Sequence, residues 1–90
     1  MRKIILLHAA WCGPCKHLIR SLIPVVEQAC PGQVETVDIS DDPQNLIRKY
    51  KIKRVPTFLL VDDESVMALS RNPGRDYLIE WLRGDKNGSD

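Results

Sequence analysis

Two cysteines, Cys12 and Cys15, are separated by one glycine and one proline in the segment "AWCGPCK". An apolar run precedes the pair, and apolar residues at three- and four-residue steps follow it, so the pair lies where a strand passes into a helix. Cysteines with this spacing can exchange electrons, contribute to a metal site or form a small structural disulfide. The rest of the chain must fit one of these three roles, so this segment limits the fold more than any other.

Short apolar runs bounded by turn residues predict four strands. They are Lys3–His8, Val34–Ile39, Pro56–Asp62 and Ser65–Ser70. Helical periodicity predicts three helices, which lie within residues 13–30, 40–52 and 72–84. The order is therefore β-α-β-α-β-β-α, with a right-handed first crossover between parallel strands and an antiparallel last pair. This order is typical of an α/β fold with a four-stranded mixed sheet and helices on both faces.

Prolines and glycines mark the expected ends of the helices. Pro24 should kink the first helix or end its regular part, because it cannot donate to the carbonyl of Arg20. Pro43 is expected at an early position of the second helix. Gly84 should end the third helix, in which Tyr77, Leu78, Trp81 and Leu82 share one apolar side. Residues 1–84 are thus expected to form the domain, and residues 85–90 a disordered polar tail.

Composition gives little indication of a charged partner. The chain has 90 residues, of which 13 are basic and 12 acidic, and its net charge is +1. Charges of both signs are interspersed, with no basic arm or acidic tail, so we expect neither a nucleic acid nor a membrane surface as partner. The apolar run at the N-terminus is too short for a signal peptide, and three cysteines are an odd number. These features predict a cytoplasmic protein, which we expect to be a monomer.

The position of the pair suggests a mechanism. Cys12 should lie near the N-cap of the helix, where unpaired N–H groups and the helix dipole stabilise a thiolate. Pro14 suits the first helical turn, and Gly13 lets a substrate backbone approach. Cys15, one turn later, should face the protein body. Cys12 would attack a target disulfide, and Cys15 would then resolve the mixed disulfide.

The other two roles fit the chain less well. A structural zinc site needs four ligands, and the remaining candidates are His8, His17 and Cys30. Cys30 should lie roughly 20 Å from the pair along the helix, so we predict no metal and interpret Cys30 as an apolar helix-end residue. A disulfide across so short a loop also removes little entropy from the unfolded chain.

Two separate segments resemble the thioredoxin family: "WCGPCK" at 11–16 and "KIKRVPTFLLV" at 51–61. The resemblance covers residues 3–83 and implies a minimal thioredoxin fold. It implies that the protein is a protein-disulfide reductase, with Cys12 as the attacking thiol and Cys15 as the resolving thiol. It also implies no bound cofactor beyond the redox-active Cys12–Cys15 disulfide. A flavin- and NADPH-dependent reductase would regenerate the dithiol.

The resemblance also assigns substrate-binding residues. Pro56 would be cis and face the cysteine pair, and the backbone at Val55 would pair with the incoming peptide as an added strand. Trp11 and Pro14 would form an apolar rim around the pair, with Gly13 between the cysteines. Disulfide-containing proteins would therefore be the substrates.

The sequence departs from the family pattern beneath the motif. Leu6 replaces the buried aspartate found six residues before the first cysteine, and Thr36 or Val37 replaces the buried lysine. His8 shares a strand face with Leu6, which makes it a candidate proton acceptor for Cys15; the alternative is a polar strand-end residue. Two other functions stay open: a glutaredoxin-like, glutathione-linked reductant, and a non-catalytic binding module with the same fold.

Overall fold

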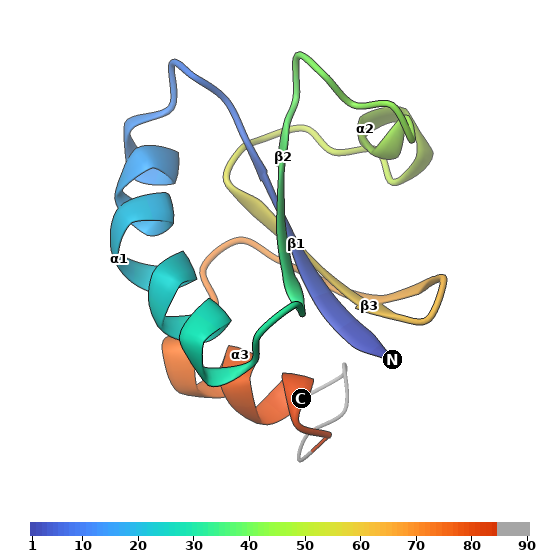
Figure 1. Ribbon diagram of the computed structural model, residues 1–90. Coiled ribbons are helices and arrows are strands. Elements are labelled where there is room, and N and C mark those ends of the chain that lie inside the picture. The colour runs from blue at the N-terminus through green and yellow to red at the C-terminus, as the bar shows by residue number, and fades with distance from the viewer. Residues whose placement is uncertain (85–90) are drawn as a thin grey trace.

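The four predicted strands form one mixed sheet in the order β2-β1-β3-β4 (Figure 1). Their bounds are β1 Arg2–His8, β2 Val34–Asp38, β3 Thr57–Asp62 and β4 Ser65–Ser70. β1 pairs in parallel with β2 and antiparallel with β3, and β3 pairs antiparallel with β4. This computed structural model describes residues 1–84, so the tail predicted for residues 85–90 lies outside the described residues.

Three helices complete the expected order β-α-β-α-β-β-α. They are α1 Gly13–Ala29, α2 Leu46–Lys49 and α3 Arg75–Leu82. Figure 1 shows α1 and α3 on one face of the sheet and α2 on the other. The predicted α/β architecture with helices on both faces is confirmed.

Alternation along β1 decides which residues meet which helix. Ile4 and Leu6 point to the face that carries α1 and α3, where they join a core with Phe58 and Trp81. Ile5 and Leu7 point to the opposite face, where they form a core with Leu46 of the short α2. β1 is therefore the central strand that both layers of side chains cover, and its carboxyl end leads directly to the cysteine pair.

Two predicted helix boundaries differ from the structure. α1 continues through Pro24 to Ala29, so the expectation that Pro24 ends the regular helix is wrong. Pro24 lies on the exposed side, where the carbonyl that loses its partner can reach water. Pro43 lies before α2 rather than in its first turn, because Asn45 is the N-cap and adopts a left-handed conformation.

Side chains and one glycine fix the remaining helix ends. The carboxylate of Asp42 accepts a hydrogen bond from the N–H of Ile47 at 2.9 Å, which stabilises the start of α2. Gly84 follows α3 with φ of +85° and donates its N–H to the carbonyl of Trp81, as a glycine after a helix end does. Among residues 1–84, no helix has both the length and the hydropathy needed to cross a membrane.

Candidate active site

The cysteine pair begins α1, as predicted. Cys12 is the N-cap residue, and its Sγ accepts a hydrogen bond from the backbone N–H of Cys15 at 3.1 Å. Cys12 and Cys15 form a disulfide, with their Cα atoms 5.3 Å apart. Pro14 lies in the first turn, where its missing N–H has no helical acceptor to lose. Cys12 therefore caps the helix, and Cys15 lies in its first turn.

The two sulfurs lie in different surroundings. Cys15 has no exposed surface, whereas Cys12 keeps 5% of its surface exposed. Both pack against Ala9, with Ile39 and Val55 beside them. The first turn of α1 contains no acidic residue, so no carboxylate offsets the positive end of the helix dipole at Cys12. When the disulfide is reduced, this arrangement favours a thiolate at Cys12 and access to Cys12 alone.

The loop before β3 closes over the pair from the other side. The Val55–Pro56 peptide bond is cis, and Val55 packs against the cysteine cluster. The hydroxyl of the buried Thr57 donates a hydrogen bond to the carbonyl of Arg54 at 2.6 Å and so fixes this turn. Sequence reasoning did not single out Thr57. Its position directly before the apolar run Phe58–Val61 was the available signal, because a buried hydroxyl needs a partner.

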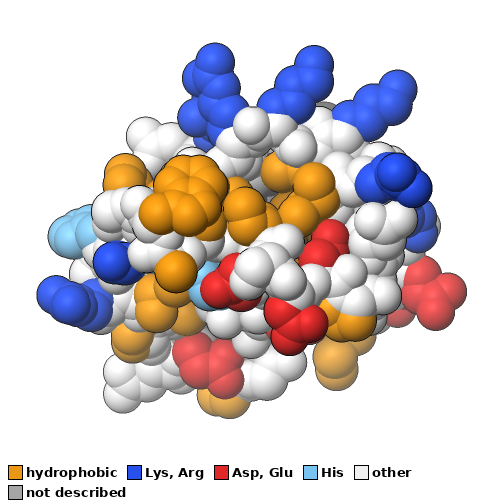
Figure 2. Space-filling view, turned by 90° about the horizontal axis from the view of Figure 1, so that it is seen from above, with side chains coloured by type: hydrophobic (Ala, Val, Ile, Leu, Met, Phe, Trp, Pro, Cys, Tyr) orange, Lys and Arg blue, Asp and Glu red, His pale blue; other side chains and the backbone are white. Residues whose placement is uncertain are grey.

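A shallow groove lies beside the pair. Its volume is about 120 Å³, and it is lined by Trp11, Ile39, Ile47, Ile52, Lys53, Arg54 and Val55. The indole of Trp11 is 75% exposed, and Gly13 and Pro14 are exposed next to it. Figure 2 shows this apolar patch with Lys and Arg side chains along one border and Asp and Glu along the other. The structure thus brings Trp11 and Val55 together, and it adds three isoleucines and two cations that sequence reasoning had not assigned to the site.

His8 ends β1 one residue before Ala9. It is half-buried, it lies opposite Asp38 on β2, and its carbonyl accepts the N–H of Ile39 at 2.8 Å. The N–H and hydroxyl of Ser40 hold the pKa of the Asp38 carboxyl below its ordinary value, and the nearby charge of His8 lowers this pKa further. An ionised carboxylate therefore lies beside the imidazole, beneath the loop that carries the cysteines.

The candidates for a metal site lie apart. Cys30 is a buried free thiol at the C-cap of α1, which agrees with its interpretation as an apolar helix-end residue. His17 is exposed on α1, two residues after Cys15. Within the part of the chain that the structure describes, no three side chains of His, Cys, Asp or Glu lie close enough to hold a metal ion.

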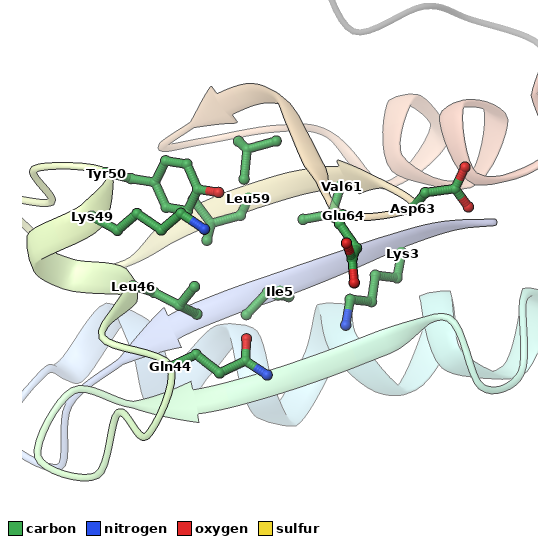
Figure 3. A pocket seen from close by; sticks show the side chains of 11 residues that line it. Lys3, Ile5, Gln44, Leu46, Lys49, Tyr50, Leu59, Val61, Asp63 and Glu64 are labelled. Atoms are coloured by element: carbon green, nitrogen blue, oxygen red, sulfur yellow. The ribbon is translucent and has the colours of Figure 1, made fainter.

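A larger hollow of about 500 Å³ lies on the α2 face, away from the cysteines (Figure 3). It exists because the four residues of α2 cover only one end of this face. Ile5, Leu59 and Val61 form its floor, Leu46 and Tyr50 lie at the α2 end, and Asp63 and Glu64 lie at the β3–β4 turn. No cysteine lines it, so of the two hollows only the smaller groove lies beside the Cys12–Cys15 pair.

Comparisons with known proteins agree with this site. The family model "Thioredoxin" matches residues 2–83. Thioredoxin from Haemophilus influenzae is 34% identical over 64 residues, which are 67% of this chain and 56% of that protein. Mitochondrial thioredoxin from Bos taurus is 41% identical over 61 residues, which are 67% of this chain and 36% of that protein. The matches therefore span between about a third and three fifths of the relatives' own lengths.

Solved structures agree with the fold. A mutant thioredoxin from Halobacterium salinarum superposes with a TM-score of 0.71 at 26% identity, over 92% of this chain and 73% of that chain. The germline-specific thioredoxin Deadhead from Drosophila melanogaster superposes with a TM-score of 0.74 at 21% identity, over 92% of this chain and 79% of that chain. The family model covers nearly the whole described chain, with the cysteine pair inside the matched region. The chain therefore belongs to the thioredoxin family.

Proposed function

We propose that this protein is a thiol-disulfide oxidoreductase that reduces disulfides in other proteins. One observation carries the proposal: a disulfide-bonded pair whose first cysteine caps a helix and whose second is fully buried, beside an apolar groove. A helix N-terminus lowers the pKa of a thiol, which makes the first cysteine a nucleophile near neutral pH. The groove gives a substrate chain a surface next to that nucleophile.

The reaction moves two electrons in two exchanges. The thiolate of Cys12 attacks one sulfur of the substrate disulfide, that bond breaks, and the other substrate sulfur leaves as a thiolate and takes a proton. Cys15 then loses its proton and attacks Sγ of Cys12. The mixed disulfide breaks, the second substrate sulfur leaves as a thiol, and the Cys12–Cys15 disulfide forms. The substrate is reduced and the protein is oxidised.

The residues around the pair orient the substrate in this proposal. Trp11 and Pro14 offer an apolar rim, and Gly13 leaves room for a substrate backbone between the cysteines. The backbone at Val55, set by the turn at Pro56, pairs with an extended substrate segment as an added strand. The proximity of Val55 to both cysteines supports this pairing, because it lets one peptide contact the groove and the attacking sulfur together.

His8 is our candidate for the group that takes the proton from Cys15. It points to the α1 face of the sheet by strand alternation, and it lies near the ionised carboxylate of Asp38. With Leu6 in place of the family's buried aspartate, His8 is the candidate that the sequence offers beneath the cysteine loop.

The protein's setting is also a proposal. We infer a reducing, cytoplasmic environment, supported by the free thiol of Cys30, and a monomer, supported by the fact that one chain supplies the complete site. An NADPH-dependent flavin reductase would return two electrons to the Cys12–Cys15 disulfide.

Insulin reduction with dithiothreitol tests the proposed activity. Cys12→Ser should abolish turnover, and the serine hydroxyl should keep the N-cap, so the loss will not reflect unfolding. In the Cys15→Ser variant, Cys12 should attack insulin once, and the mixed disulfide between Cys12 and insulin should accumulate because no second thiol resolves it. If the wild-type protein reduces insulin no faster than the cysteine variants, the proposed activity is wrong and a non-catalytic binding module is the remaining function.

Two further measurements separate the remaining functions. Replacing dithiothreitol with glutathione, or with NADPH and a thioredoxin reductase, identifies the electron source: faster turnover with glutathione would favour the glutaredoxin-like function. The reduction potential of the Cys12–Cys15 pair shows whether the protein reduces or oxidises the disulfides of its substrates. A value near about −270 mV fits a general reductant, and a value near about −120 mV fits an oxidant.

A further inference from the structure

The groove beside the cysteines is unevenly charged. Lys53 and Arg54 line it next to Val55, so two cations lie within the surface that a substrate contacts. They belong to the segment "RKYKIKR" at 48–54, which has five basic residues among seven and no acidic residue. In Figure 2, basic side chains border the apolar patch on one side. The net charge of +1 for the whole chain hides this local concentration.

The two cations are not engaged within the described chain. Lys53 and Arg54 are both exposed, and within residues 1–84 neither of their side chains forms an ion pair or a hydrogen bond. The carboxylates of Asp38 and Asp42 have other partners: Asp38 accepts two hydrogen bonds from Ser40, and Asp42 accepts the N–H of Ile47. Among residues 1–84, no acidic residue lines the groove or forms an ion pair with Lys53 or Arg54, so the two positive charges face the solvent beside the groove.

The backbone beside the two cations lies close to the reacting sulfurs. The carbonyl of Arg54 accepts the hydroxyl hydrogen bond of the buried Thr57, and the next residue, Val55, packs against the cysteine cluster. A substrate segment that pairs with the backbone at Val55 must therefore pass the side chains of Lys53 and Arg54. Charges at the edge of an interface act on the choice of partner and on the rate of encounter more than on the strength of the final complex.

We propose that Lys53 and Arg54 make the protein selective for disulfides whose reacting cysteine has acidic side chains beside it. The occupant of the groove is an extended, acidic segment of the substrate, with an apolar side chain against Trp11 and the isoleucines. This proposal rests on the proposed disulfide reduction and adds its substrate class. The exchange chemistry is unchanged, because the cations act before and during docking.

Matched peptides test the selectivity. Three disulfide peptides differ only in the residues that flank the reacting cysteine, which are Glu, Gln or Lys. The wild-type protein should reduce them in the order Glu, Gln, Lys, with the Glu peptide about three- to tenfold faster than the Gln peptide at low salt. Added salt should reduce this ratio, because the charges are exposed.

Two double variants with the same change in net charge separate the groove from the rest of the surface. Lys53→Gln with Arg54→Gln should bring the Glu-to-Gln ratio near one. Arg20→Gln with Arg83→Gln removes two exposed cations outside the groove and should keep the wild-type ratio. Circular dichroism of both variants checks that they are folded.

The outcomes are distinct. A wild-type protein that reduces all three peptides at one rate overturns the selectivity, as does a preference that persists in the Lys53→Gln, Arg54→Gln variant. If the Glu-to-Gln rate ratio falls equally in both double variants, the preference comes from net charge, and the proposed role of Lys53 and Arg54 is overturned. Absence of any Cys12-dependent reduction of the peptides contradicts the proposed function itself, which is a different result from unselective reduction.

Discussion

Cys12 and Cys15 lie one helical turn apart, yet they differ in the two properties that exchange chemistry depends on. Cys12 retains slight exposure and caps the helix, whereas Cys15 is completely buried. Burial disfavours the charged form of a thiol, so in the proposed reaction Cys15 requires a proton acceptor before it attacks the mixed disulfide. At the scale of single residues, the attack by Cys15 is therefore the proposed step that neighbouring groups must assist.

His8→Ala tests this assistance. Without the imidazole, Cys15 must lose its proton to water, so the rise of turnover with pH should move to higher pH. Near neutral pH the rate should fall by about a hundredfold, the lower end of what a positioned base contributes. The measurement is the rate of insulin reduction between about pH 5 and 9, the range in which histidine titrates.

His17→Ala is the matched control, because His17 is an exposed histidine on α1. Its pH profile should equal that of the wild-type protein. If the His8→Ala profile also equals it, His8 is a polar strand-end residue without a role in proton transfer.

At the scale of secondary-structure elements, helix α1 positions the cysteine pair. Its first turn supplies the N–H groups that face Cys12, and the rest of the helix packs its apolar side on the core with α3. Most of the stability of such a helix comes from this packing, which lets α1 continue through Pro24. Pro24 therefore destabilises α1 locally, at a position several turns from the cysteine pair.

Pro24→Ala should stabilise the protein by about 1–2 kcal/mol. Alanine restores a helical N–H and has a higher helix propensity, and the entropy that proline removes from the unfolded chain offsets part of this gain. The midpoint of urea unfolding measures the change, with Ser21→Ala as an exposed control on the same helix. An unchanged or lower midpoint would show that the tertiary packing depends on the helix geometry at Pro24.

At the scale of the whole molecule, the two tryptophans have different roles: one packs in the core and the other lies on the surface at the groove. Trp81 has no exposed surface and connects α3 to the sheet: its carbonyl accepts a bond from Arg2 at 2.7 Å, and the Arg2 guanidinium lies 4.8 Å from its ring centroid. Trp11 is 75% exposed at the groove. One side chain therefore belongs to the core and the other to the substrate surface.

Trp81→Ala should cost about 3–5 kcal/mol of unfolding free energy. That is a large part of the roughly 5–13 kcal/mol typical of a domain of this size. Trp11→Ala should change stability by about 0.5 kcal/mol or less, and it should lower the rate of peptide reduction because it removes the apolar rim. Urea unfolding and insulin reduction, measured on both variants, check this division. A stability loss in Trp11→Ala equal to that in Trp81→Ala would contradict it.

Much of the fold follows from the spacing of apolar residues along the sequence. The period of apolar residues located all three helices and four strands, because each element must bury one face or one side. The placement of Cys12 at a helix start and of Trp81 in the core follows from the same periodicity. These features depend on residues that are near one another in the chain.

The contacts between distant segments were decided by the tertiary structure. Sequence alone does not reveal that three isoleucines join Trp11, or that Lys53 and Arg54 border the same groove. These residues come from separate segments of the chain, and the packing of β1 against β2 and β3 brings those segments to one end of the sheet. The sequence by itself determined where the helix begins and which two cysteines lie at its start. The tertiary structure decided what surrounds them, because the shape and charge of a groove depend on segments that meet only in the folded chain.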